Sequence, residues 1–328
     1  MSRPRHPEIA RAVAELSAKG LLEEPARTRL PRIAAGDLLS IRPEIHVLLY
    51  AGVLLLTAAA GLFLKVHSRD IGPVTIAGAL TLACTACFGY AIRKAPPFSW
   101  GKVEAPSVAF DYIVLLAVLL LGSDLAYLES QFRLLGSSWE YHLLLMSVVG
   151  LTVAYRFDSA AVLPLALSSF AAWRGVSTRL SLPLIFGDVS ARLRVNSVIC
   201  GVLFLVGAVA SARLRKKPHF EAVWGHLGAL LLFGGLLAGV FGEGSPGWWR
   251  WEAVLLTASV VIGLVSFRIR RAGYFAEAVL AGYGGGLGVL FAEVHGLAAV
   301  SLIIAGSAAA VATALAVVWK RLRESHEG

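Results

Sequence analysis

The sequence predicts an all-α, polytopic transmembrane helical bundle, and two observations carry the prediction. Of 328 residues, 57% are hydrophobic and only 16% are charged, and the mean hydropathy is +0.72. Apolar runs of about 20 residues, the length that crosses ~30 Å of hydrocarbon, recur along the chain. A soluble protein of this size could not bury so much apolar surface, because its own surface needs polar groups. The composition therefore excludes a soluble enzyme, a nucleic-acid-binding module and a disordered chain.

The chain divides by composition into three parts. They are a cytoplasmic amphipathic module (1–43), a transmembrane domain (44–320) and a cytoplasmic tail (321–328). In the module, apolar residues at helical spacing predict a helix over residues 7–19 that ends at Gly20, and a second over residues 21–35, interrupted by Pro25 and Pro31. We expect a small helical hairpin. It either rests on anionic headgroups or docks a membrane-protein partner.

About ten apolar segments are expected to span the membrane. They are residues 44–65, 72–92, 110–129, 139–155, 158–174, 195–213, 221–242, 252–268, 273–293 and 297–319. The fifth segment has the weakest signal, because it is short and contains Pro164. A split after this segment leaves two five-helix halves of opposite orientation, the arrangement of an inverted repeat.

Positive charge predicts the orientation of these segments. The formal net charge is +9, and most of the 30 Lys and Arg residues fall in loops on one side of the ten-span arrangement. That side is cytoplasmic, because Lys and Arg collect in cytoplasmic loops. If segment 158–174 did not cross, the later loops would change sides and the asymmetry would shrink. We therefore expect a protein of the bacterial inner membrane with both termini in the cytoplasm, and no nucleic-acid partner.

Three ionisable residues within the apolar segments are candidates for substrate binding or proton-linked function. Glu277 and His226 each lie about one turn from the cytoplasmic end of a segment, and Asp124 lies near the external end of the third. Such groups are costly in a bilayer and point to function, unless they snorkel to an interface. No catalytic triad, metal-ligand cluster or carboxylate pair has a spacing that requires chemistry. We therefore expect no catalytic residues, no metal, no cofactor and no enzyme activity.

Glycines spaced four residues apart predict close helix packing in the seventh and ninth segments. These helix-packing candidates are Gly235, Gly239, Gly282, Gly284, Gly286 and Gly288. A locally unwound helix that lines a cavity is the alternative interpretation of the second group. The Cys84 and Cys87 pair has the spacing of a redox or zinc site, but it lies inside an apolar segment and indicates packing instead.

Two stretches of the chain resemble a known family. They are HVLLYAGVLLLTAAAGLFLK from His46 and LLLGSDLAYLESQFRLLGSSWEYHLLLMSVVGLTVAY from Leu119. They resemble the bacterial predicted-membrane-protein family called domain of unknown function 2157, over roughly residues 8–175. The resemblance runs through Gly61, Leu128, Gln131, Gly136 and Trp139, with Arg133 where a tyrosine-like residue is expected. It implies a multi-pass bacterial inner-membrane protein, and it carries no established activity.

Two classes of function remain open at this point. The first is a membrane protein without catalytic activity, a subunit or scaffold of a membrane complex, and it fits the few buried charges and the many small packing residues. The second is a secondary transporter for a small solute, with Glu277, Asp124 and the glycine-rich ninth segment around a cavity. Ten short-looped segments are similar in architecture to drug/metabolite exporters. The lipid bilayer is the expected partner in both cases.

Overall fold

The computed structural model describes residues 15–17, 19–20, 48–59, 61–62, 72–133, 136–175, 191–242, 248–293, 306–309, 311–313 and 316. All regular structure in these residues is helical, which confirms the all-α class. The chain divides into two compact units, Met1–Gly52 with Arg323–Gly328, and Val53–Leu322. Each unit is considered by itself.

The first unit is described at few positions. Residues 15–17 are helical, the backbone N–H of Lys19 donates to the carbonyl of Glu15 at 3.0 Å, and Gly20 follows with a φ of 67°. A positive φ after a helical turn is the conformation that favours glycine, so Gly20 lies where the sequence predicts the first helix to end. The remainder of the predicted hairpin and the tail 321–328 lie outside the described residues.

The second unit contains a series of consecutive helices. They are α4 (Pro73–Lys94), α5 (Val108–Phe132), α6 (Tyr141–Phe157), α7 (Val162–Trp173), α8 (Ala191–Arg213), α9 (Glu221–Val240), α10 (Trp248–Arg268) and α11 (Ala272–Glu293), with 3-10 turns at Gly136–Ser138 and Pro218–Phe220. These helices fall on the second to ninth predicted segments. A further helix, Leu48–Ala59, falls on the first. The tenth is described only at residues 306–309, 311–313 and 316, which are helical.

Five helices within the described residues are long and apolar enough to cross a membrane, by length and composition. They are Pro73–Lys94, Ala109–Phe132, Ala191–Arg213, Pro218–Val240 and Trp249–Arg268. The helix α7 is shorter, at 12 residues, and its length of about 18 Å is less than the ~30 Å of a hydrocarbon core. It begins four residues later than predicted. Pro164 thus lies in its first turn, where backbone N–H groups have no acceptor within the helix, so a proline costs no helical hydrogen bond. The count of ten spans stays a prediction.

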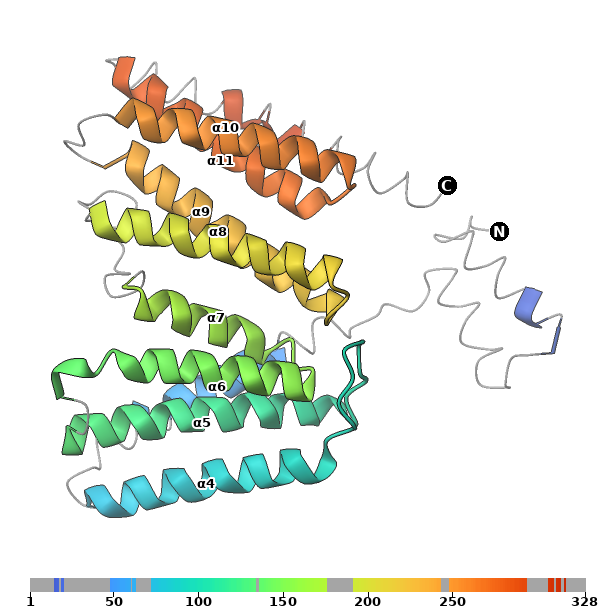
Figure 1. The fold of residues 1–328 in the computed structure, drawn as a ribbon, viewed down its shortest axis with the longest axis vertical. Coiled ribbons are helices and arrows are strands. Elements are labelled where there is room, and N and C mark those ends of the chain that lie inside the picture. The colour runs from blue at the N-terminus through green and yellow to red at the C-terminus, as the bar shows by residue number, and fades with distance from the viewer. Residues whose placement is uncertain are drawn as a thin grey trace. The chain divides into compact units, whose positions relative to one another are not determined.

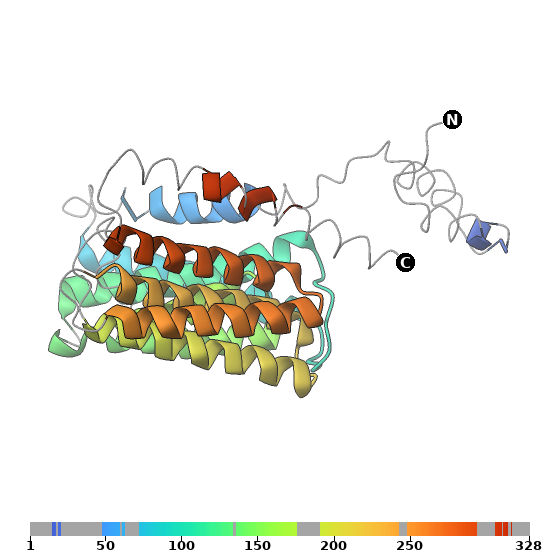
Figure 2. The ribbon, with the colours of Figure 1, turned by 90° about the horizontal axis from the view of Figure 1, so that it is seen from above.

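Neighbouring helices pair as antiparallel hairpins (Figure 1). The pairs with the most extensive contacts are α4 with α5, α6 with α7, α8 with α9, and α10 with α11. Seen from above, the helices run side by side with similar axes (Figure 2). The helix α9 also contacts α7, α10 and α11, and it is the most buried of the five apolar helices. The region α8–α11 is therefore organised around α9.

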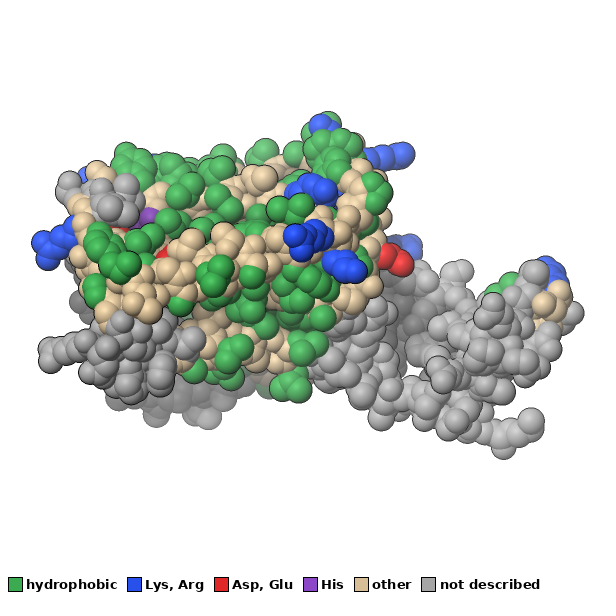
Figure 3. All heavy atoms as spheres, turned by 90° about the horizontal axis from the view of Figure 1, so that it is seen from below, with side chains coloured by type: hydrophobic (Ala, Val, Ile, Leu, Met, Phe, Trp, Pro, Cys, Tyr) green, Lys and Arg blue, Asp and Glu red, His purple; other side chains and the backbone are tan. Residues whose placement is uncertain are grey.

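The sides of these helices carry exposed apolar residues. Val74, Leu82 and Ile92 on α4 point outward, and α10 presents Val260 and Leu264 in the same way. In the space-filling view, hydrophobic side chains cover the middle of the face, and Lys and Arg lie toward its ends (Figure 3). A bilayer solvates the first kind of surface in its hydrocarbon layer and the second at its headgroups. This chain is a membrane protein.

Candidate functional site

His226 and Glu277, two of the three predicted site residues, are in contact. Each lies five residues beyond the first residue of its helix, on α9 and α11, which pack together and begin at the same end of the bundle. The two side chains thus reach the same depth. His226 Nδ1 and Glu277 Oε1 are 2.6 Å apart, and the side chains are 46% and 31% exposed. The pair bridges two helices at the outer surface of the bundle.

Further polar contacts continue from this pair toward the helix ends. The ring of Tyr274 stacks on His226, with centroids 4.5 Å apart. The Tyr274 hydroxyl donates to Glu221 Oε1 at 3.2 Å, and the guanidinium of Arg271 lies 2.9 Å from Glu221 Oε2. A row of side chains from Arg271 to Glu277 therefore joins the starts of α9 and α11.

Two glycines make room for the aromatic rings of this row. A Cβ atom at Gly225 would lie 2.0 Å from the Tyr274 hydroxyl, and one at Gly273 would lie 2.8 Å from Cε1 of His226. Each ring thus lies over a glycine of the opposite helix. In each helix a glycine directly precedes the aromatic residue, in Gly225-His226 and in Gly273-Tyr274. The ring from each helix therefore packs on the glycine of the other helix, and the two rings stack between α9 and α11.

The chemistry open to this row is ion pairing and proton exchange. The His226 side chain is partly exposed, while Glu277 Oε2 is buried without a hydrogen-bond partner among the described residues. Within that part of the chain, no group of three His, Cys, Asp or Glu side chains is placed to hold a metal ion. The contacts of this row connect α9 to α11.

Asp124, the third predicted residue, lies in a different contact. It is buried on α5, and its Oδ2 accepts a hydrogen bond from the Thr81 hydroxyl of α4 at 2.7 Å. One turn further along α4, the buried Cys84 thiol faces the carbonyl of Ala117 at 3.6 Å. Cys84 and Cys87 are free thiols. These polar groups thus join α4 to α5, and Asp124 does not contribute to the His226–Glu277 row.

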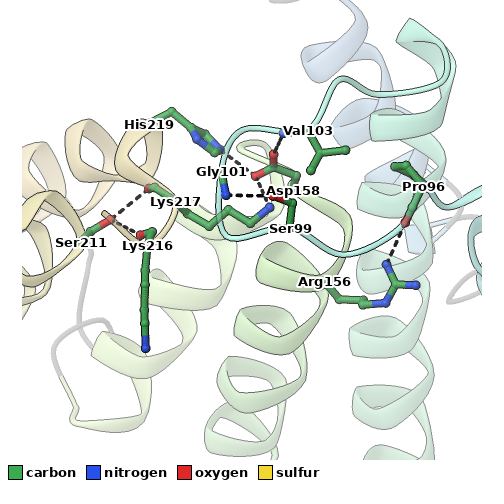
Figure 4. A network of polar contacts seen from close by, with 10 residues as sticks. All are labelled: Pro96, Ser99, Gly101, Val103, Arg156, Asp158, Ser211, Lys216, Lys217 and His219. Carbon is green, nitrogen blue, oxygen red and sulfur yellow. Dashed lines mark hydrogen bonds and ion pairs between the residues drawn. The ribbon is translucent and has the colours of Figure 1, made fainter. Parts of the chain in front are cut away.

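A second charged cluster, absent from the sequence predictions, lies in the loops at one end of the bundle (Figure 4). Asp158 follows α6 with a φ of 58°, in the left-handed conformation that ends a helix. Its Oδ1 lies 3.1 Å from Lys217 Nζ and 2.7 Å from His219 Nε2, and its Oδ2 accepts the backbone N–H of Val103. The Lys217 and Asp158 side chains are 0% and 4% exposed. We call these residues the Asp158–Lys217 cluster.

Backbone contacts extend this cluster across three loops. The N–H of Lys217 donates to the carbonyl of Trp100 at 2.7 Å, and the Ser211 hydroxyl donates to the carbonyls of Lys216 and Lys217 at 2.9 Å each. The Lys217 ammonium also lies 5.5 Å from the Phe98 ring centre. The cluster therefore ties the loop before α5, the end of α6 and the loop after α8. Lys217 is one of many Lys and Arg residues in loops, and Asp158 is the first residue of a predicted segment, so no spacing in the sequence signals the pair.

The predicted packing glycines fall into two groups. Five of them face a neighbouring helix: a Cβ atom would lie 3.0 Å from the Arg194 carbonyl at Gly235, 2.4 Å from Trp251 at Gly239, 3.3 Å from Ser259 at Gly282, 3.0 Å from Leu237 at Gly284 and 2.5 Å from Val240 at Gly288. A Cβ atom at Gly286 would meet no described atom within 4 Å. Gly286 is exposed and no described helix packs on it, so close packing at this residue stays a prediction.

The comparison with known families accounts for the first part of the chain. Residues 14–163 match the model of a family described as a predicted membrane protein (DUF2157). The predicted resemblance is confirmed. The DUF2157 match ends at the second residue of α7, so it includes Asp124 and Asp158, whereas Lys217, His226 and Glu277 lie beyond it. The Asp158–Lys217 cluster thus connects the DUF2157 region to the following helices. No curated protein and no solved structure matches the chain.

Proposed function

We propose that this protein is a non-catalytic, multi-pass protein of the bacterial inner membrane that acts as a subunit or scaffold of a membrane complex. One observation carries the proposal: the predicted solute-binding groups are engaged in contacts between helices. Glu277 pairs with His226 across α9 and α11, and Asp124 accepts from Thr81 across α4 and α5. Groups used in this way stabilise a rigid bundle, and a rigid bundle suits a protein that holds a partner in place.

The charge distribution supports an orientation for this bundle. Arg93 and Lys94 end α4, Arg213 ends α8 and Arg268 ends α10, all at the end that carries the Asp158–Lys217 cluster. Under the positive-inside rule that end faces the cytoplasm, together with both termini. We assign partner binding to residues 1–43, whose Arg27, Arg29 and Arg32 offer positive charge to an acidic partner surface.

The test is the native mass of the full chain after extraction in a mild detergent, with the proteins of the purified peak identified by mass spectrometry. A subunit should carry a second membrane protein and a mass well above the 34.8 kDa of one chain. Replacing Arg27, Arg29 and Arg32 with Glu should release that protein, while Lys102→Glu, on the exposed loop before α5, should not. A wild-type peak that contains one chain alone would contradict the proposal.

A secondary transporter is the second candidate, and one observation favours it. Glu252 on α10 is 5% exposed, and neither carboxylate oxygen has a hydrogen-bond partner among the described residues. A buried, unpaired acid inside a membrane bundle is a group that a proton-coupled carrier would use.

A further inference from the structure

The carboxylate of Glu252 lies against the glycine face of α11. A Cβ atom at Gly285 would lie 2.8 Å from Glu252 Oε1, and one at Gly288 would lie 3.6 Å from Oε2. The side chain therefore occupies space that the two glycines leave free. Gly285 was not among the predicted packing glycines, and Glu252 was not among the predicted ionisable sites, because nothing in the sequence shows that these residues meet.

The same match between a polar residue and a glycine occurs two turns further along α10. Ser259 is 8% exposed, its hydroxyl has no partner among the described residues, and a Cβ atom at Gly282 would lie 3.3 Å from Ser259 Cβ. Residues seven apart share one helix face. Because α10 and α11 are antiparallel, Ser259 meets Gly282 while Glu252 meets Gly285 and Gly288. A polar face of α10 is thus in register with a glycine face of α11.

No described cation compensates Glu252. The helices α9 and α11 pack against α10, and no described charged or titratable side chain of α8, α9 or α11 forms an ion pair or hydrogen bond with Glu252, although Arg194 lies at the same end of the bundle and its Nε has no described partner. These side chains include Glu221, His226, Tyr274 and Glu277 in the row at the helix starts, Tyr283 with Ser307, and, on the adjoining α8, Arg194 with the carbonyl of Ala238. In the described part of the chain, the carboxyl group lies against Gly285 and Gly288 and has no hydrogen-bond partner.

We propose that Glu252 is a proton-binding site, and that it carries its proton while α10 and α11 are packed together. An ionised carboxylate buried without a partner is costly, whereas the neutral acid removes the charge and needs only a hydrogen-bond acceptor. Binding adds one proton to one carboxylate oxygen and breaks no other bond. A metal cation is a poorer occupant, because it requires several oxygen ligands and glycines supply no side-chain oxygen.

This site would make helix packing depend on protonation. Loss of the proton places a charge between α10 and α11, and the charge is relieved when water or a cation enters between the helices. The inference does not rest on the proposed scaffold role, because the scaffold is tested by native mass and the site by titration.

The experiment is the thermal unfolding midpoint of the purified full chain from about pH 5 to about pH 9. Above the pH at which an exposed glutamate loses its proton, the unfolded chain releases the proton of Glu252 while the folded chain keeps it. Each further pH unit therefore lowers the free energy of unfolding, and the wild-type midpoint should fall by about 3 °C per pH unit. Glu252→Gln keeps the size and neutrality of the protonated acid. It should remove this slope and should match or exceed wild type at high pH. Glu104→Gln, on an exposed loop, should keep the wild-type slope.

A second measurement uses infrared difference spectra, in which the C=O band of a protonated carboxyl group should be present at neutral pH in wild type and Glu104→Gln, and absent in Glu252→Gln. A wild-type slope and an unchanged band in Glu252→Gln would overturn the proposal. A Glu252→Gln variant that does not fold at any pH would also overturn it, because that result requires an ionised, paired carboxylate.

Discussion

The helices α4–α7 and α8–α11 have similar apolar compositions but are held together differently. In the second region glycines lie at the contacts: a Cβ atom at Gly201 would come within 2.5 Å of the backbone nitrogen of Leu232 on α9. In the first region, a Cβ atom at Gly78 or Gly89 on α4 would have no described atom within 4 Å. Among the described glycines of this region, only Gly150 on α6 has a comparably close neighbour. Close backbone approach therefore dominates the second region, because glycine removes the side chains that keep helices apart.

Charge is also placed differently in the two regions. Both regions hold a buried ionisable group within a helix, Asp124 on α5 and Glu252 on α10. In α8–α11 the ion pair between His226 and Glu277 also lies within helices. In α4–α7 the buried ion pair lies beyond a helix end, at Asp158, and its cation comes from the other region. The first region thus depends on an ionic contact outside the apolar layer, where the surrounding backbone can supply hydrogen bonds to the charges. Three substitutions test whether the two regions differ in this way.

The largest effect is expected at Gly201. Gly201→Leu forces a branched side chain into backbone atoms of α9, which cannot move without separating α8 from α9, so we expect almost no folded protein. The matched control is Gly78→Leu on α4, where the space is open. The measurement is the yield of monodisperse protein in detergent. Equal yields for the two variants would show that glycine contacts do not distinguish the regions.

A smaller but still large effect is expected where the regions join. Lys217→Met leaves Asp158 buried with His219 as its one remaining side-chain partner among the described residues, and we expect a loss of about 3 kcal/mol in unfolding free energy. Lys216→Met, which removes an exposed neighbour, should cost much less. Adding Asp158→Asn to Lys217→Met should restore part of the stability. Denaturant unfolding of the purified proteins gives these values. If the double variant recovers no stability, Lys217 and Asp158 do not stabilise the fold through their mutual contact.

The smallest effect is expected at the His226–Glu277 pair. Glu277→Gln keeps a hydrogen-bond acceptor beside His226, and the pair is partly exposed, so we expect a loss of about 1 kcal/mol or less. His226→Asn should behave alike, and the double variant should cost less than the sum, because both changes remove one contact. Thermal unfolding checks this result. A Glu277→Gln protein of unchanged stability whose solute binding has lost its pH dependence would favour the transporter.

Much of the fold was predictable from local signals. The ranges of α4–α6 and α8–α11 follow the apolar runs to within a few residues. A bilayer requires about 20 apolar residues per crossing, and it requires that the backbone hydrogen bonds of each crossing segment are made within that segment. Pro164 marked the short helix α7, and Gly20 marked the end of a helical turn. The candidate site was predicted only as separate residues. His226 and Glu277 are 51 positions apart, and no spacing relates them.

The partners of these residues were decided by the tertiary structure. A helix of a soluble protein shows its buried face as an apolar stripe, whereas these helices are apolar on all sides, so the sequence does not indicate which face meets a neighbour. That is why Gly286 was grouped with Gly284 although the two point in different directions, and why Glu252 and Gly285 were not connected. The sequence sets where each helix lies along the chain, because length and hydropathy are local properties. The rotation of each helix about its axis, and hence every polar contact, depends on side chains from elsewhere in the chain.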